Sequence, residues 1–88
     1  MAEVTILSPD GNTQTTVQSD EDGFIQLDYI TTAPDFATCV LLKYKLGDSE
    51  ETIEINPIDG RFEPPSGGWS QDGITITAVF GINTLFKI

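Results

Sequence analysis

The stretch Thr-Cys-Val-Leu-Leu-Lys-Tyr-Lys-Leu, residues 38–46, decides the fold class of this chain. Four apolar side chains alternate along it and are expected on one face, namely Val40, Leu42, Tyr44 and Leu46. The opposite face carries Leu41, Lys43 and Lys45. Alternation with a period of two over several residues is typical of a β-strand with one buried face. We therefore predict that this stretch is the central strand of a sheet.

Similar runs lie on both sides of this strand, separated by turn signals that contain Gly, Pro, Asn or Asp. Further strands are predicted at residues 3–7, 13–18, 24–31, 51–56, 74–80 and 84–88, with a short one at 61–63. Turns are predicted where Pro9 presets φ and where Gly11 and Gly23 can adopt positive φ. No stretch repeats apolar residues at helical spacing for two turns, so no helix is predicted.

The alternation also predicts which side chains point into the core. On the expected strand 24–31 these are Ile25, Leu27 and Tyr29. On the strand 51–56 they are Ile53 and Ile55. On the strand 74–80 they are Ile74, Ile76, Ala78 and Phe80. Several short strands at even spacing favour a sandwich or small barrel. We predict an all-β fold, an antiparallel immunoglobulin-like β-sandwich of about seven short strands, with residues 1–88 as a single domain.

Charge is the strongest signal in the composition of this 88-residue chain. Fourteen acidic residues stand against four basic ones and give a formal net charge of −10. Such a charge disfavours direct binding to nucleic acid and to anionic membranes. Two interpretations stay open: the acids keep a β protein soluble, or they attract a basic protein surface and mimic nucleic-acid phosphates.

The residue types that most enzymes use are largely missing. There is no His and only one Cys, which excludes Ser-His-Asp triads, Cys-His pairs and zinc sites built from these ligands. Cys39 lies in an apolar run and is predicted to be a small buried hydrophobe. Acidic residues gather at 20–23 and 48–51, but neither group follows the order of an EF-hand loop. We predict no enzymatic activity, no cofactor and no metal.

Four residues are candidates for contact with a partner protein: Trp69, Leu41, Arg61 and Phe62. Trp69 follows a Pro- and Gly-rich segment, and Trp is common at interface hot spots. The alternative is that Trp69 folds back as a lid over one end of the core. Leu41 interrupts a polar strand face and is either exposed or covered by the irregular segment 57–71, which also contains Arg61 and Phe62.

Four segments together resemble a known class of domain. They are VTILSPDG at residues 4–11, GFIQLDY at 23–29, LLKYKLGD at 41–48 and DGITITAV at 72–79. In this order they resemble strands A, B, C and F of the immunoglobulin-like and fibronectin-type-III-like modules of bacterial surface proteins and tailed-phage virions, with residues 84–88 in the place of strand G. The cysteine pair and central-strand Trp of antibody domains are absent.

The resemblance implies a structural role rather than catalysis. We expect a non-enzymatic binding module, a small phage capsid decoration or accessory protein that docks on a capsid or other virion protein, alone or as a homo-oligomer. One alternative is an acidic inhibitor of a nucleic-acid-handling host protein, and a second is a carbohydrate- or calcium-binding module. The start Met1-Ala2-Glu3 lacks the basic region of a signal peptide, so synthesis in the cytoplasm is expected. The resemblance implies a place in the virion.

Overall fold

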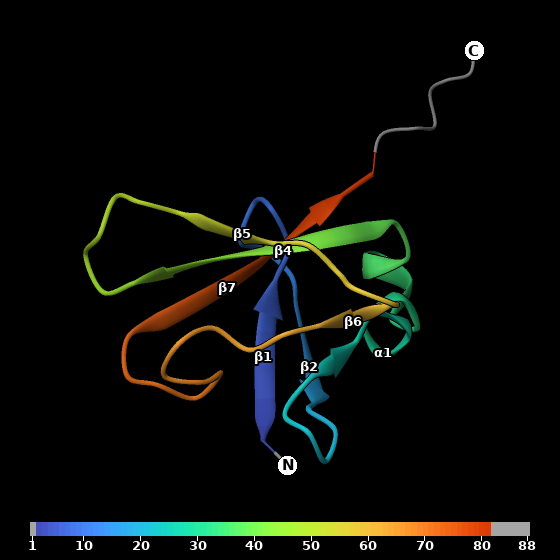
Figure 1. The fold of residues 1–88 in the computed structure, drawn as a ribbon. Coiled ribbons are helices and arrows are strands. Elements are labelled where there is room, and N and C mark those ends of the chain that lie inside the picture. Colours follow the sequence, from blue (N-terminus) through green and yellow to red (C-terminus); the bar gives the residue numbers. More distant parts are fainter. Residues whose placement is uncertain (1, 82–88) are drawn as a thin grey trace.

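The computed structural model describes residues 2–81 as a chain that is mostly strands with little helix (Figure 1). The elements in chain order are β1 (Glu3–Leu7), β2 (Gln14–Gln18), β3 (Ile25–Gln26), α1 (Leu27–Thr31), the 3-10 helix η1 (Pro34–Phe36), β4 (Cys39–Leu46), β5 (Ile53–Ile55), β6 (Arg61–Phe62) and β7 (Ile74–Phe80). The strands predicted at 3–7 and 74–80 are confirmed with the same bounds, and those at 13–18, 38–46, 51–56 and 61–63 are confirmed with shorter ones. The strand predicted at 84–88 lies outside the described residues.

Five strands form the main sheet in the order β2-β1-β7-β4-β5. The long strands β4 and β7 pair antiparallel at its centre, from Cys39 opposite Phe80 to Leu46 opposite Ile74. The expectation of a purely antiparallel fold is wrong, because β1 lies parallel to β7, with Leu7 next to Thr77. Alternation shows which face of a strand is buried but contains no information on the direction of its neighbour.

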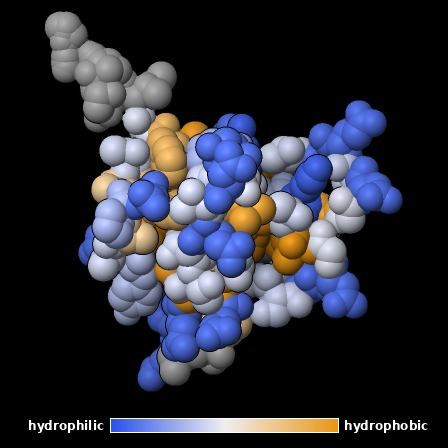
Figure 2. All heavy atoms as spheres, turned by 180° about the vertical axis from the view of Figure 1, so that it is seen from behind, coloured by the Kyte–Doolittle hydropathy of each residue, from blue (hydrophilic) through white to orange (hydrophobic). Residues whose placement is uncertain are grey.

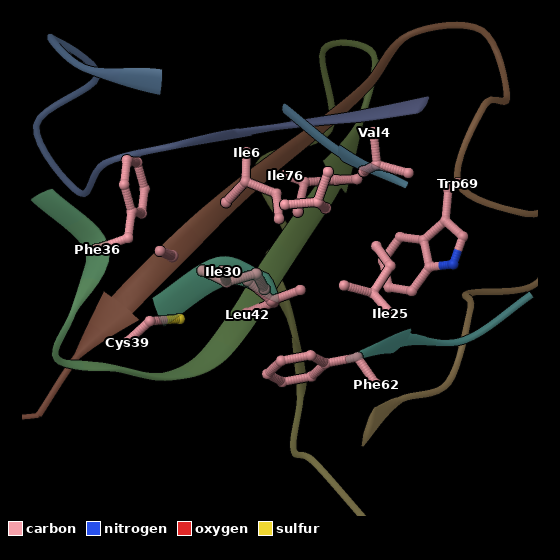
Figure 3. Packing of buried hydrophobic residues seen from close by; sticks show 12 residues of the cluster. Val4, Ile6, Ile25, Ile30, Phe36, Cys39, Leu42, Phe62, Trp69 and Ile76 are labelled. Carbon is pink, nitrogen blue, oxygen red and sulfur yellow. The ribbon is translucent and has the colours of Figure 1, made fainter. Parts of the chain in front are cut away.

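One face of this sheet is covered by a second layer, which consists of the pair β3–β6, α1 and η1 (Figure 1). The core lies between the two layers and contains the buried residues Val4, Ile6, Val17, Ile25, Ile30, Phe36, Cys39, Leu42, Phe62, Trp69, Ile76 and Ala78. Figure 3 shows these side chains pointing toward one another from the sheet and from the covering segments. No element among residues 2–81 covers the other face of the sheet, which we call the open face.

The prediction of one long strand at 24–31 is wrong beyond Gln26, where the chain turns into the helix α1. A strand would bury Tyr29, which is in fact 52% exposed, whereas Ile30 is fully buried. Leu27 and Ile30 are three residues apart and face the core from the same side of a helix, and this burial outweighs the local alternation. The helix is short because Pro34 disfavours a helical conformation at the residue before it, and Ala33 is extended with φ −74° and ψ 125°.

A β-bulge between Cys39 and Leu41 changes the orientation of the first part of β4. Residues 39 and 42 would face opposite sides of a regular strand, yet both are buried here. The bulge reconciles these orientations and turns Val40 outward, where it is 43% exposed. The predicted inward orientation of Val40 is therefore wrong, while that of Leu42 is confirmed.

Candidate protein-contact surfaces

The hairpin β4–β5 extends from the covered part of the sheet, so both of its faces reach the surface (Figure 1). Its pairs are Leu42 with Ile55, Lys43 with Glu54, and Tyr44 with Ile53. The loop that joins the strands is fixed at its base, since Gly47 N–H donates to Gly73 O at 2.8 Å. Beyond this base the loop contains three exposed acids, Asp48, Glu50 and Glu51.

The core-facing side of this hairpin is only partly covered. Four apolar residues form what we call the hairpin patch: Tyr44, Leu46, Ile53 and Ile74. Leu46 and Ile53 are 39% and 48% exposed, and Tyr44 and Ile74 are half-buried against the core. Ile53 lies on the core-facing side of the sheet, as predicted, but it is not buried. This side of the sheet extends past the covering layer at Ile53. Figure 2 shows hydrophobic residues that reach the surface in small groups among hydrophilic ones on the face seen there.

The open side of the same hairpin has different chemistry. Lys43 and Lys45 line a shallow hollow of about 270 Å³ together with Tyr44 and the hydroxyl-bearing residues Thr52, Thr75 and Thr77. Among residues 2–81 neither lysine has an ion pair within 4.0 Å, although Glu54 is the cross-strand neighbour of Lys43. The two faces of the hairpin therefore differ sharply, with apolar side chains on one and cationic and hydroxyl groups on the other.

Exposed carboxylates occur along the whole chain. Of the fourteen acidic residues, all but Asp20 are exposed. Asp20 Oδ1 accepts hydrogen bonds from the N–H groups of Asp22 and Phe24, both at 2.9 Å, and this fixes the turn that Gly23 completes at φ +86°. Partial burial acts to raise the pKa of Asp20, but hydrogen bonds from Phe24, Gln26 and Asp22 and the Arg61 charge outweigh it and lower the pKa.

Arg61, one of the four predicted contact residues, is engaged within the molecule. Its Nη1 lies 4.0 Å from Asp20 Oδ2 and 3.9 Å from Asp22 Oδ2. Its guanidinium carbon lies 4.6 Å from the centre of the Phe24 ring, a cation–π contact. Arg61 thereby ties the β6 strand to the turn before β3, and about a third of its side chain stays exposed at 36%.

The other three predicted contact residues have different environments. Phe62 is fully buried, and Trp69 is 5% exposed with its Nε1–H donating to Gly23 O at 2.7 Å. Figure 3 shows Trp69 beside Ile25 and Val4 at one end of the core, which is the lid arrangement. Leu41 is half-buried next to Val79 on the open face. The structure contains one chain, so contact with a partner stays a prediction, but Phe62 and Trp69 present almost no surface to one.

Cys39 is buried, as predicted, and its environment favours the neutral thiol. Burial raises the pKa of Cys39 to about 11. Its Sγ lies 3.6 Å from Leu41 O. Because the thiolate is the reactive form of cysteine, this group has little nucleophilic character near neutral pH.

Residues 2–81 contain no group of three or more His, Cys, Asp or Glu side chains placed to hold a metal ion. Within the same residues no helix is long and apolar enough to cross a bilayer. Comparison with models of known protein families and with curated proteins finds no match to this chain. Function must therefore be inferred from the surfaces described above.

Proposed function

We propose that this chain is a non-enzymatic binding module that docks on a larger protein assembly. The observation that carries the proposal is the hairpin patch, in which Leu46 and Ile53 are exposed on the side of the sheet that elsewhere forms the core. Apolar residues that continue a core into solvent are typical of surfaces that a partner covers. A partner would bury this patch and add to the stability of a small domain.

The side-chain chemistry supports binding rather than catalysis. The chain has no His, and its only thiol has a raised pKa. Nearly every carboxylate is exposed, and those with a lowered pKa, Asp10 and Asp20, are engaged in turns. General acid–base catalysis near neutral pH uses carboxylates whose pKa is raised toward 7.

The assembly that we propose is a virion, with this chain as a small capsid decoration or accessory protein of immunoglobulin-like type. The support is the resemblance of four sequence segments to modules of tailed-phage virions, together with a surface suited to docking. A β-rich fold agrees with that class of module. On this proposal the direct partner is a capsid or other virion protein.

The proposal is tested by capture of partners with the tagged chain from the lysate of the cells that produce it, washed across a salt series. We expect a capsid or tail protein to be retained at high salt, because apolar contacts are not screened. Ile53→Lys should abolish this capture, whereas Thr16→Lys, the same charge change at an exposed position of β2, should leave it intact. Absence of the chain from purified particles, or equal capture by both variants, would count against the proposal.

A second candidate function is inhibition of a basic, nucleic-acid-handling protein. The observation that favours it is the gathering of Asp48, Glu50 and Glu51 in the exposed loop of the hairpin. Contacts of this kind are ionic and weaken as salt rises. Capture of a basic protein that washes off with increasing salt, and that Glu50→Lys abolishes, would favour this function over docking in a virion. The carbohydrate- and calcium-binding alternative has no comparable support, because Trp69 is buried and Asp20 and Asp22 lie near Arg61.

A further inference from the structure

The outer edge of β5 is an open sheet edge. Among residues 2–81, β5 is the last strand of the five-stranded sheet and pairs with β4 alone. In an antiparallel pair alternate residues turn their N–H and C=O groups away from the neighbour, so an edge strand presents unpaired backbone groups. Among residues 2–81 no backbone hydrogen bond joins the outer side of β5 to a turn or loop. Within the described part of the chain these groups have no partner, so an added strand could pair with them.

The side chains of β5 specify what such a strand would carry. Ile53 and Ile55 lie on the core side of the sheet, and Ile53 is 48% exposed. Glu54 is exposed on the open side. Directly opposite residues in neighbouring strands contact each other, and pairs of opposite charge are favourable while like charges are not. An added strand would therefore place apolar residues beside the isoleucines and a cation beside Glu54.

The negative charge around this edge favours a basic partner over a second copy of the chain. The loop before β5 contains Asp48, Glu50 and Glu51, and Asp59 follows β5. Two such edges would bring like charges together, whereas a basic segment would be attracted. β5 has no Pro or Lys, and what protects it against other copies of the chain is its length of three residues and the charge of Glu54. The acids thus oppose self-association and leave the edge available to a basic strand.

The other edge of the sheet, β2, lacks this combination. Its exposed residues are Gln14, Thr16 and Gln18, which are uncharged and polar, and its one apolar residue, Val17, is buried. An added strand would find neither apolar surface nor charge there. Of the two ends of the five-stranded sheet, β5 alone combines free backbone groups with an exposed apolar side chain and an anion.

We propose that β5 accepts an extended segment of the partner protein as a sixth strand, with Lys or Arg opposite Glu54 and apolar residues opposite Ile53 and Ile55. This inference rests on the proposed docking function and names its mode and the chemistry of the partner segment. Main-chain hydrogen bonds would provide affinity, and the alternating side chains would provide selectivity.

The first test uses defined peptides with the full-length chain. The probe is an acetylated heptapeptide in which valine and lysine alternate, and its control has glutamate in place of every lysine. We expect the basic probe to bind, with NMR shifts confined to residues of β5 and its neighbours, and the acidic control not to bind. Glu54→Lys should raise the Kd of the basic probe by roughly fivefold or more and allow the acidic probe to bind. A roughly fivefold change in Kd corresponds to about 1 kcal/mol, the size expected for one cross-strand pair.

Two controls separate this site from general electrostatics. Glu21→Lys changes the net charge equally at an exposed turn residue without a described ion pair, and it should leave the preference for the basic probe intact. Strand addition uses one edge of the peptide only. Two probes methylated on the backbone nitrogens of opposite edges should therefore differ, with one losing binding and the other keeping it.

Three results would overturn the inference. The first two are equal effects of Glu54→Lys and Glu21→Lys, and equal binding of both methylated probes. The third is a concentration-dependent dimer of the chain with NMR shifts at β5 that the basic probe does not displace, which would make a second copy the occupant. Partner capture by the wild-type chain that Glu54→Lys leaves unchanged would reject the β5 edge while the docking function stands. Failure to capture any virion protein, with the peptide preference intact, would reject the virion role instead.

Discussion

Trp69 joins the segment before β7 to the turn before β3. Its indole N–H donates to Gly23 O at 2.7 Å, and its ring fills one end of the core. We predict that Trp69→Phe lowers the free energy of unfolding by about 1–3 kcal/mol, since it removes a hydrogen bond and leaves a void. Urea denaturation followed by far-ultraviolet circular dichroism measures this change.

A suitable aromatic control is Tyr29→Phe, because Tyr29 is 52% exposed and has no side-chain hydrogen bond among the described residues. Its effect should stay within about 0.5 kcal/mol, as is usual for surface substitutions. Equal stability of the Trp69→Phe variant and the wild type would mean that the indole is not a structural part of the core. Trp69 would then return as a candidate for partner contact.

Cys39 makes the stability of the fold sensitive to alkaline pH. Its pKa is raised to about 11 in the folded chain, while the ordinary value is 9.0. Between these values the unfolded chain loses the thiol proton more readily, so the free energy of unfolding decreases as pH rises from about 9 to 11. Well below pH 9 the thiol is neutral in both states and contributes no pH dependence.

The measurement is a series of urea denaturation curves at pH 8, 9, 10 and 11 for the wild type and for Cys39→Ala. The variant is expected to be less stable than the wild type at pH 8 because it leaves a small cavity, but to lose less stability above pH 9, so that the difference shrinks as pH rises. Parallel pH profiles of the two proteins would show that burial does not hold the Cys39 proton.

At the scale of elements, a two-residue turn just before β6 positions that strand against β3. Ile58 and Arg61 exchange backbone hydrogen bonds of 2.8 and 3.1 Å across Asp59 and Gly60, which have φ values of +55° and +78°. Positive φ at both central residues is the mark of a type I′ hairpin turn, for which Asp-Gly is a preferred sequence. Gly60 O also accepts from Leu27 N–H at 2.8 Å and so positions the start of α1.

We predict that Gly60→Ala lowers the free energy of unfolding by about 1–2 kcal/mol. An added Cβ would meet no atom within 4 Å, so the cost arises only from the left-handed backbone conformation. Gly60→Asn should cost less, because Asn tolerates this conformation. Thermal denaturation of both variants tests the order, and an equal loss in the two would contradict this explanation.

The elements that the sequence predicts well are those with the longest apolar alternation. β4 and β7 pack on each other at the centre of the sheet, and their alternation reflects one covered face. α1 could not be predicted, because Leu27 fits two patterns: a strand in which Ile25 and Tyr29 are also inward, and a helix in which Ile30 is inward instead. Only the position of the covering layer decides between the two patterns, and that position depends on contacts distant in sequence.

The same physical reason limits prediction of the candidate site. Residues 53 and 55 have identical side chains and the same orientation, yet one is exposed and the other half-buried. The difference depends on how far the second layer extends along the sheet, which alternation does not show. The acidity of the loop at 48–51, by contrast, is evident from the sequence, because an exposed turn places every charge in solvent.

At the scale of the whole molecule, negative charge opposes compactness. The net charge is −10, and the ion pairs among residues 2–81 are those of Arg61 with Asp20 and Asp22, at 4.0 and 3.9 Å. Carboxylates on every side therefore repel one another with little local compensation, and such self-repulsion destabilises a folded chain. Salt screens the repulsion between exposed charges once the Debye length is shorter than the distance between them. The Debye length is about 10 Å in 0.1 M salt.

We therefore predict that sodium chloride stabilises this protein. The midpoint of urea denaturation should rise between roughly 0.01 and 0.3 M salt, where the Debye length changes most, and then level off. The levelling distinguishes screening from general salting-out, which continues to grow with concentration. Glu50→Lys and Glu51→Lys together should raise stability at low salt and reduce this dependence. A midpoint that falls as salt rises would mean that attractive pairs such as Arg61 with Asp20 outweigh the repulsion.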